Sequence, residues 1–169
     1  MKAFLSTLII LFFAISIHAQ DNPIYQGKTI LYKDFKINGL LFIAAKGDII
    51  KQFGKPQRLF EPKYECGFLS EDVQEKKFYT LKYKHILFTG NETVRYQLEE
   101  IKFDPEADLK VTYKRKPLSH LTTKKDFEKI LKVKIDEDEV TLIHKDADDS
   151  LIFYFLNGRL SRMEYWSPC

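Results

Sequence analysis

The chain of 169 residues carries 27 Lys and Arg against 24 Asp and Glu, which gives a formal net charge of +3. Hydrophobic residues make up 44% and charged residues 30% of the sequence, which excludes a disordered or collagen-like chain. The small net charge also excludes a strongly basic protein that holds nucleic acid by charge alone. The sequence therefore predicts a globular protein that binds no nucleic acid, with one domain or two very small ones.

The N-terminal segment has the pattern of a secretory signal peptide. Lys2 gives a positive start, Ala3–Ile17 is almost entirely apolar, and Ala19 ends the segment with a small residue. The apolar run is shorter than the roughly 20 residues that span a bilayer, and no Cys directly follows it for lipid attachment. We therefore expect cleavage of residues 1–19 near Ala19, which leaves residues 20–169 as a periplasmic or extracellular protein without a membrane span; the alternative is an uncleaved anchor.

Two stretches of the chain align with each other when the sequence is shifted by 78 residues. Phe35–Phe53 then falls on Tyr113–Leu131, and five of the nineteen aligned positions are identical. Several other aligned positions keep their apolar character, as a packed fold would require. This pattern predicts one α+β domain of two tandem repeats, about 28–104 and 107–166, each with a short helix packed on antiparallel strands.

The second repeat contains a clear helix start. Thr123 and Asp126 have the spacing of a capping box, and Phe127, Ile130 and Leu131 then form one apolar stripe. A helix this short does not hold alone in water, so we expect it to pack on a sheet.

The first repeat contains the corresponding helix. Asp48 aligns with the acidic residue of the second helix start, and Gly54 with Pro56 marks the end of the helix. We expect Ile49, Ile50 and Phe53 to face inward.

Strand signals follow each helix. Residues 79–83 and 94–98 alternate apolar with polar side chains, which predicts strands with one buried face, and Thr89–Glu92 reads as the turn between them. We also expect a strand over Leu81–Phe88, which places His85 within it. Asn157-Gly158 lies between apolar runs and predicts a tight hairpin.

The closing strands of the two repeats share a slip of one residue. Their apolar residues are spaced by three and then by two, as a β-bulge requires. These residues are Leu98, Ile101 and Phe103 in the first repeat, and Leu160, Met163 and Tyr165 in the second.

A helix that ends in FGKP (Phe53–Pro56), followed by strands of this pattern, resembles the repeat of β-lactamase-inhibitory proteins and the small lipoprotein subunit of the outer-membrane assembly machine. The segments KINGLLF and GDIIKQFGKP, followed by FYTLKYKHILF, also resemble small bacterial proteins of the immunity type. The resemblance implies a non-catalytic protein-binding role and assigns no functional residue.

The sequence contains none of the common catalytic or nucleotide-binding motifs. His85, His120 and His144 are too far apart in the sequence for a typical zinc site, so we expect neither a metal nor a cofactor. Two acidic runs, 136–139 and 146–149, read as hairpin turns; the second begins like a calcium loop but lacks its glycine and final glutamate.

Cys66 and Cys169 form a possible disulfide, since exported proteins usually meet an oxidising compartment. The alternative is two unpaired thiols, because Cys169 is the last residue of the sequence and chain ends fray.

The last hairpin offers the candidate binding site. Residues 151–156 are apolar at every position, so either both faces are covered, as expected for a central strand, or one face is open to a partner. In the second case Tyr154, Arg162 and Trp166 are the residue types that anchor interfaces. The densest positive stretch would suit an acidic partner or phospholipid headgroups if it is not simply solvated. It consists of Lys110, Lys114, Arg115, Lys116, Lys124, Lys125, Lys129, Lys132 and Lys134.

Two functions remain open from the sequence. The first is an exported, monomeric, non-enzymatic module that binds another protein, of the inhibitor, immunity or envelope-assembly type. The alternative is a small exported hydrolase whose site is assembled from dispersed residues such as His144, Asp146 and Glu164.

Overall fold

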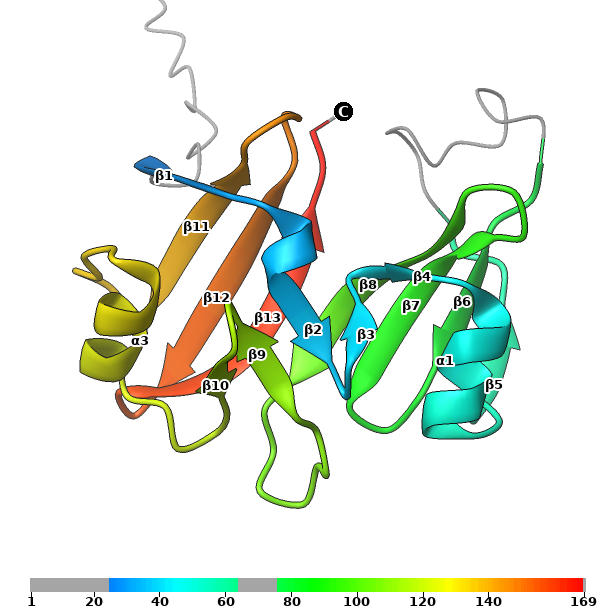
Figure 1. Cartoon of the computed structure of the whole chain (residues 1–169), viewed down its shortest axis with the longest axis horizontal. Coiled ribbons are helices and arrows are strands. Elements are labelled where there is room, and N and C mark those ends of the chain that lie inside the picture. Colours follow the sequence, from blue (N-terminus) through cyan, green and yellow to red (C-terminus); the bar gives the residue numbers. More distant parts are fainter. Residues whose placement is uncertain (1–24, 64–75, 169) are drawn as a thin grey trace, which may run out of the picture.

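The computed structural model describes residues 25–63 and 76–168, which form an α+β fold. The predicted signal segment and both cysteines, Cys66 and Cys169, lie outside the described residues. Two sheets of nine and four strands make up most of the described chain, with two short α-helices beside them (Figure 1). Within the described ranges, no helix is long and apolar enough to cross a bilayer.

The nine-stranded sheet is mixed. In spatial order its strands are β1 (Tyr25–Ile30), β11 (Glu139–His144), β12 (Ser150–Leu156), β13 (Arg159–Trp166), β8 (Arg95–Lys102), β7 (Ile86–Asn91), β6 (Tyr79–Lys82) and β5 (Arg58–Phe60), and β4 (Ile43–Ala44) also pairs with β8. The pairing of β1 with β11 is parallel, and the other pairings are antiparallel.

The four-stranded sheet consists of two hairpins side by side. Its spatial order is β10 (Lys116–Leu118), β9 (Val111–Tyr113), β2 (Phe35–Ile37) and β3 (Leu40–Leu41). Both hairpins turn in two residues of positive φ, which fits the right-handed twist of the strands. The turn residues are Asn38 (φ 49°) and Gly39 (φ 87°) in one hairpin, and Lys114 (φ 47°) and Arg115 (φ 68°) in the other.

The predicted helices are confirmed as α1 (Lys46–Phe53) and α3 (Lys124–Leu131). The capping box of α3 is present: Thr123 Oγ1 accepts a hydrogen bond from Asp126 N at 3.1 Å and donates one to Asp126 Oδ2 at 2.6 Å. This contact with Thr123 lowers the pKa of the Asp126 carboxyl. Gly54 ends α1 at φ 76°, a conformation that favours glycine.

Both helices and the small sheet pack on the same face of the large sheet, here called its inner face. From α3, the ring of Phe127 lies 4.8 Å from that of Phe153 and 5.3 Å from that of Phe155. From α1, Phe53 lies 5.8 Å from Phe88. One core results, although the expectation for Ile50 is wrong: it is 38% exposed, because the short helix has room for only one narrow apolar stripe.

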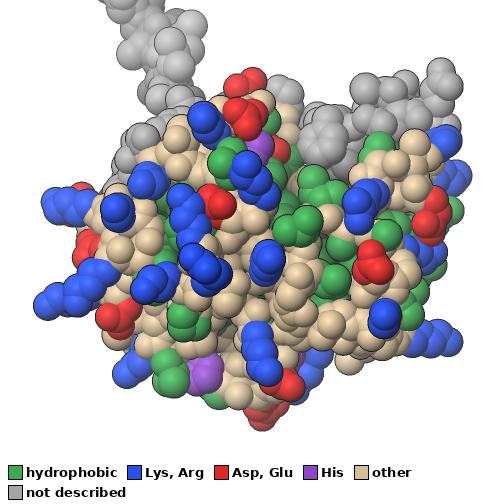
Figure 2. Space-filling model, in the orientation of Figure 1, with side chains coloured by type: hydrophobic (Ala, Val, Ile, Leu, Met, Phe, Trp, Pro, Cys, Tyr) green, Lys and Arg blue, Asp and Glu red, His purple; other side chains and the backbone are tan. Residues whose placement is uncertain are grey.

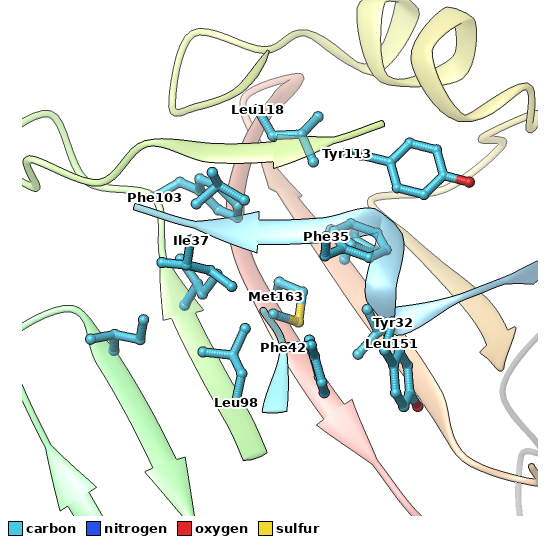
Figure 3. Close-up of a cluster of buried hydrophobic side chains, with 14 of the residues drawn as sticks. Tyr32, Phe35, Ile37, Phe42, Leu98, Phe103, Tyr113, Leu118, Leu151 and Met163 are labelled. Atoms are coloured by element: carbon cyan, nitrogen blue, oxygen red, sulfur yellow. The ribbon is translucent and has the colours of Figure 1, made fainter. Parts of the chain in front are cut away.

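The centre of the core lies between the two sheets (Figure 3). Phe35 and Ile37 point from β2 toward the large sheet, where Leu98 and Met163 meet them (Figure 3). Lys36, between them on β2, is exposed on the other side of the small sheet. The alternation of β2 therefore divides the small sheet into an apolar inner side and a polar outer side.

The two predicted bulges are confirmed. Between β7 and β8 the pairing shifts so that Glu99 has no opposite residue, and between β12 and β13 Ser161 is the extra residue. The predicted hairpin at Asn157-Gly158 is also confirmed, with φ of 52° and 72°.

The predicted turn at Thr89–Glu92 is wrong. The structure keeps Gly90 inside β7 and turns at Glu92–Val94, because the side chain of Asn91 accepts hydrogen bonds from Thr93 N and Val94 N at 2.9 and 3.0 Å. Gly90 instead permits a close approach between strands, since a Cβ atom there would lie 1.9 Å from Arg95 O.

The predicted place of His85 is also wrong. It lies between β6 and β7, not within a strand, because the chain turns over Tyr83–His85 and Tyr83 N donates to Ile86 O at 3.0 Å.

Candidate functional site

Strand β12 shows how the burial of the two faces of the large sheet differs. Leu151, Phe153 and Phe155 are buried on the inner face, whereas Ile152 and Tyr154 on the opposite face are only partly buried. In the described part of the chain both helices and the small sheet lie on the inner side, so this opposite face is here called the outer face. The inner face of this strand is therefore covered, and Ile152 and Tyr154 on its outer face are partly exposed.

Tyr154 and Arg162 are in contact on the outer face. They are opposite each other across β12 and β13, and the Arg162 guanidinium carbon lies 4.2 Å from the centre of the Tyr154 ring. The bulge makes this possible, because Ser161 takes no place in the pairing and its hydroxyl donates to Tyr154 O at 3.0 Å. Without the extra residue, Ser161 would be opposite Tyr154.

Glu164 completes the arrangement. Its carboxylate forms an ion pair with the Arg162 guanidinium, and both side chains are partly exposed. Burial, and then a hydrogen bond to the Glu164 carboxylate, raise the pKa of Tyr154 to about 12. The phenol is therefore a neutral donor at physiological pH, and three side chains of different chemistry are held together before any partner arrives.

Trp166 shares this face but does not touch the other two predicted residues. It is opposite Ser150, and four residues of extended strand separate it from Arg162, a distance of about 13 Å. Ile152 and Glu164 are opposite each other between these two ends. We call Ile152, Tyr154, Arg162, Glu164 and Trp166 together the outer β12–β13 face.

The outer β12–β13 face continues onto β8 with alternating charge. Lys102 pairs in register with Arg162, and Glu100 pairs with Glu164.

The three residues of the alternative hydrolase site are not brought together. His144 belongs to the inner face and its ring stacks on that of Tyr32 at 4.0 Å, whereas Glu164 belongs to the outer face. Asp146 is exposed in the turn between β11 and β12. The sheet itself therefore separates His144 from Glu164.

His144 instead belongs to a polar cluster that sequence reasoning missed. Its Nδ1 atom lies 3.7 Å from Asp149 Oδ1, and the Tyr165 hydroxyl donates to Asp149 Oδ2 at 2.9 Å. Burial is the main cause of the raised pKa values of both Tyr32 and Tyr165, and Asp149 raises them further. Tyr165 had a signal in the bulge spacing, but nothing local in the sequence links Tyr32 to the others. The cluster connects Tyr32, which follows β1 in the sequence, with His144 on β11 and Tyr165 on β13.

No group of three or more His, Cys, Asp or Glu side chains in residues 25–63 and 76–168 is placed to hold a metal ion. Comparisons of the chain with protein-family models, with curated proteins and with solved structures found no match. Function is therefore inferred from the sequence and from the geometry of the described residues.

Proposed function

We propose that this chain is an exported, monomeric, non-enzymatic module that binds another protein through the outer β12–β13 face. An inhibitor, immunity or envelope-assembly role would each use such a module, in line with the resemblance stated for Phe53–Pro56. The signal-peptide pattern of residues 1–19 supports export to the periplasm or the cell exterior.

The observation that carries the proposal is the preorganised contact of Tyr154, Arg162 and Glu164. Tyrosine and arginine are enriched among the residues that dominate binding energies. Here the ring contact and the ion pair already fix both side chains, so binding would cost less conformational entropy than it would for free side chains. Partly exposed Ile152 and Trp166 add apolar area beside them.

A two-repeat architecture forms part of the proposal. The helices α1 and α3 keep the offset of 78 residues at both ends. Four antiparallel strands, β5 to β8, follow α1, whereas three, β11 to β13, follow α3, and the last strand of each set carries a bulge. These last strands, β8 and β13, are neighbours with Ile101 opposite Met163, the second apolar residue of each bulge pattern.

The small sheet repeats this relation. In the pairing of β2 with β9, Phe35 is opposite Tyr113, the residue on which it falls in the alignment shifted by 78 residues. Corresponding positions opposite each other in two separate sheets are what a two-fold relation between repeats would produce.

The experiment is affinity capture from envelope extract with the mature chain as bait, repeated with Tyr154→Ala and Arg162→Ala. Arg58→Ala is the matched control, because Arg58 also lies over an aromatic ring, Phe60 at 5.0 Å, but on the edge strand β5. A captured protein is then purified and its Kd is measured against each variant.

Loss of a dominant contact costs about 2 kcal/mol or more, so we expect each variant on the outer face to weaken binding about 30-fold or more. The Arg58 variant should stay within about twofold, as expected for a site outside the interface. A partner that binds Tyr154→Ala as tightly as the wild-type chain would place the interface elsewhere.

A further inference from the structure

A polar cavity of about 390 Å³ lies on the side of the molecule that carries the small sheet. Apart from Gly39 of the first hairpin turn, its lining residues are all polar: Lys36, Asn38, Gln52, Asp108, Lys110 and Thr112. Its volume falls in the range of small-molecule sites. This cavity is independent of the outer β12–β13 face, which lies on the other side of the large sheet.

The backbone around the cavity is fixed. Asn38 N donates to Lys110 O at 3.0 Å, and Lys110 N donates to Asn38 Oδ1 at 2.7 Å. This reciprocal pair joins the first hairpin turn to the segment before β9. The Asn38 amide nitrogen is then the part of that side chain left to donate toward a ligand.

The strand pattern brings the cationic and hydroxyl groups to one side. Lys36 on β2 is opposite Thr112 on β9, while their neighbours Ile37 and Val111 are buried in the core. Because side chains alternate along a strand, Lys110 falls on the same side as Thr112. Two lysines, one threonine and the amide residues Asn38 and Gln52 therefore line one cavity.

The positive charge of the two lysines is only partly balanced, because Asp108 is the single carboxylate among the lining residues. Neither Lys36 nor Lys110 lies within ion-pair distance of a carboxylate among the described residues, whereas nearby Lys114 is paired with Asp34 at 3.4 Å. Figure 2 shows further Lys and Arg side chains gathered across the middle of this side of the molecule. The field there favours an anion.

We propose that this cavity binds a small phosphate ester that carries hydroxyl groups. The two lysines and Thr112 would donate to the phosphate oxygens, as lysine does in many phosphate sites. Asp108, the carboxylate at the rim, would accept a hydrogen bond from a hydroxyl of the same ligand. Glycerol phosphate has both groups, and it occurs both as a free ester and as the headgroup of phosphatidylglycerol.

The test is isothermal titration of the full mature chain with sn-glycerol 3-phosphate at fixed ionic strength, with glycerol as the uncharged comparison. The variant Lys36→Gln/Lys110→Gln removes both cations from the cavity. The matched control Lys125→Gln/Lys129→Gln removes the same charge from exposed positions of α3, away from the cavity. Sedimentation with phosphatidylglycerol or phosphatidylcholine vesicles forms a second arm.

We expect binding of glycerol 3-phosphate but not of glycerol, weakened about tenfold or more by the cavity variant because charge-assisted hydrogen bonds are lost. The control variant should change the affinity less than about twofold, because neither of its lysines lines the cavity and salt screens exposed charges. Sedimentation with phosphatidylglycerol that depends on the same two lysines would identify the lipid headgroup as the source of the ester. The proposal would be overturned if neither glycerol 3-phosphate nor phosphatidylglycerol vesicles bound the chain. Equal losses of affinity in the cavity variant and the control variant would overturn it as well.

Discussion

Replacing Phe127 by alanine should destabilise the fold more than any other single change in α3. The side chain is fully buried, and its ring contacts those of Phe153 and Phe155 at 4.8 and 5.3 Å. Removing a large buried aromatic side chain costs about 3–5 kcal/mol, and the two ring contacts favour the upper half of that range. Because α3 has eight residues, it cannot remain helical without this packing.

Urea unfolding followed by circular dichroism measures this cost. With a denaturant slope of about 2 kcal/mol per M, the midpoint should fall by about 2 M. Three comparison variants should lose less unfolding free energy, in decreasing order. Phe53→Ala comes first, because its side chain is only partly buried, and Thr123→Ala follows, because it removes an N-cap worth about 1 kcal/mol. Leu121→Ala should cost least, because Leu121 is 63% exposed. If Phe127→Ala cost no more than Thr123→Ala, the packing of α3 on β12 described above would be wrong.

Three further predictions concern single positions. Gly90→Ala should destabilise the chain, because its Cβ would meet Arg95 O at 1.9 Å, whereas Gly47→Ala in α1 meets nothing within 4 Å and should stabilise the chain by about 0.5–1 kcal/mol. The melting temperature should therefore fall in the first variant and rise in the second. A shift in the same direction for both variants would contradict the account of Gly90. The pKa of the Asp126 carboxyl is lowered in the folded state, so the carboxylate stabilises the fold above its unfolded pKa and loses this effect as pH falls through its folded pKa. The difference in urea midpoint between the wild-type chain and Asp126→Asn should therefore shrink below about pH 4. A difference that grows on acidification would refute the capping contact. Glu164→Gln should lower the pKa of Tyr154 from about 12, measured by NMR titration of a ¹³C-labelled tyrosine ring, because Glu164 raises it; an unchanged value would remove Glu164 from the contact.

The sequence predicts best the features that depend on neighbouring residues. The capping box of Thr123 with Asp126 and the hairpin at Asn157-Gly158 each involve residues at most three positions apart. The hairpin turn and the bulge together also determine the contact in the candidate site. The strands pair outward from the turn, and the extra residue Ser161 then places Arg162 opposite Tyr154.

The features that depend on distant residues were not predictable. The small sheet requires β2 and β9 to pair across more than seventy residues, and the second hairpin turn uses Lys114 and Arg115 without any glycine. Nothing local in the sequence specifies either. The polar cavity was missed for the same reason, because Lys36 and Lys110 come together only through this pairing.

The parallel strand β1 covers the backbone edge of β11, to which a strand of another chain could otherwise pair. Tyr25 pairs with Thr141, a separation of 116 residues, so this pairing closes a very long loop and should form late in folding. Until it forms, β11 presents a regular backbone edge on which a second chain could add a strand. Once it forms, the outermost strand is β1, whose register shifts between Tyr25 and Thr29 and offers a poorer template. Deletion of residues 25–30 should therefore promote aggregation through β11, even though β1 contributes to neither of the surfaces proposed to bind a ligand.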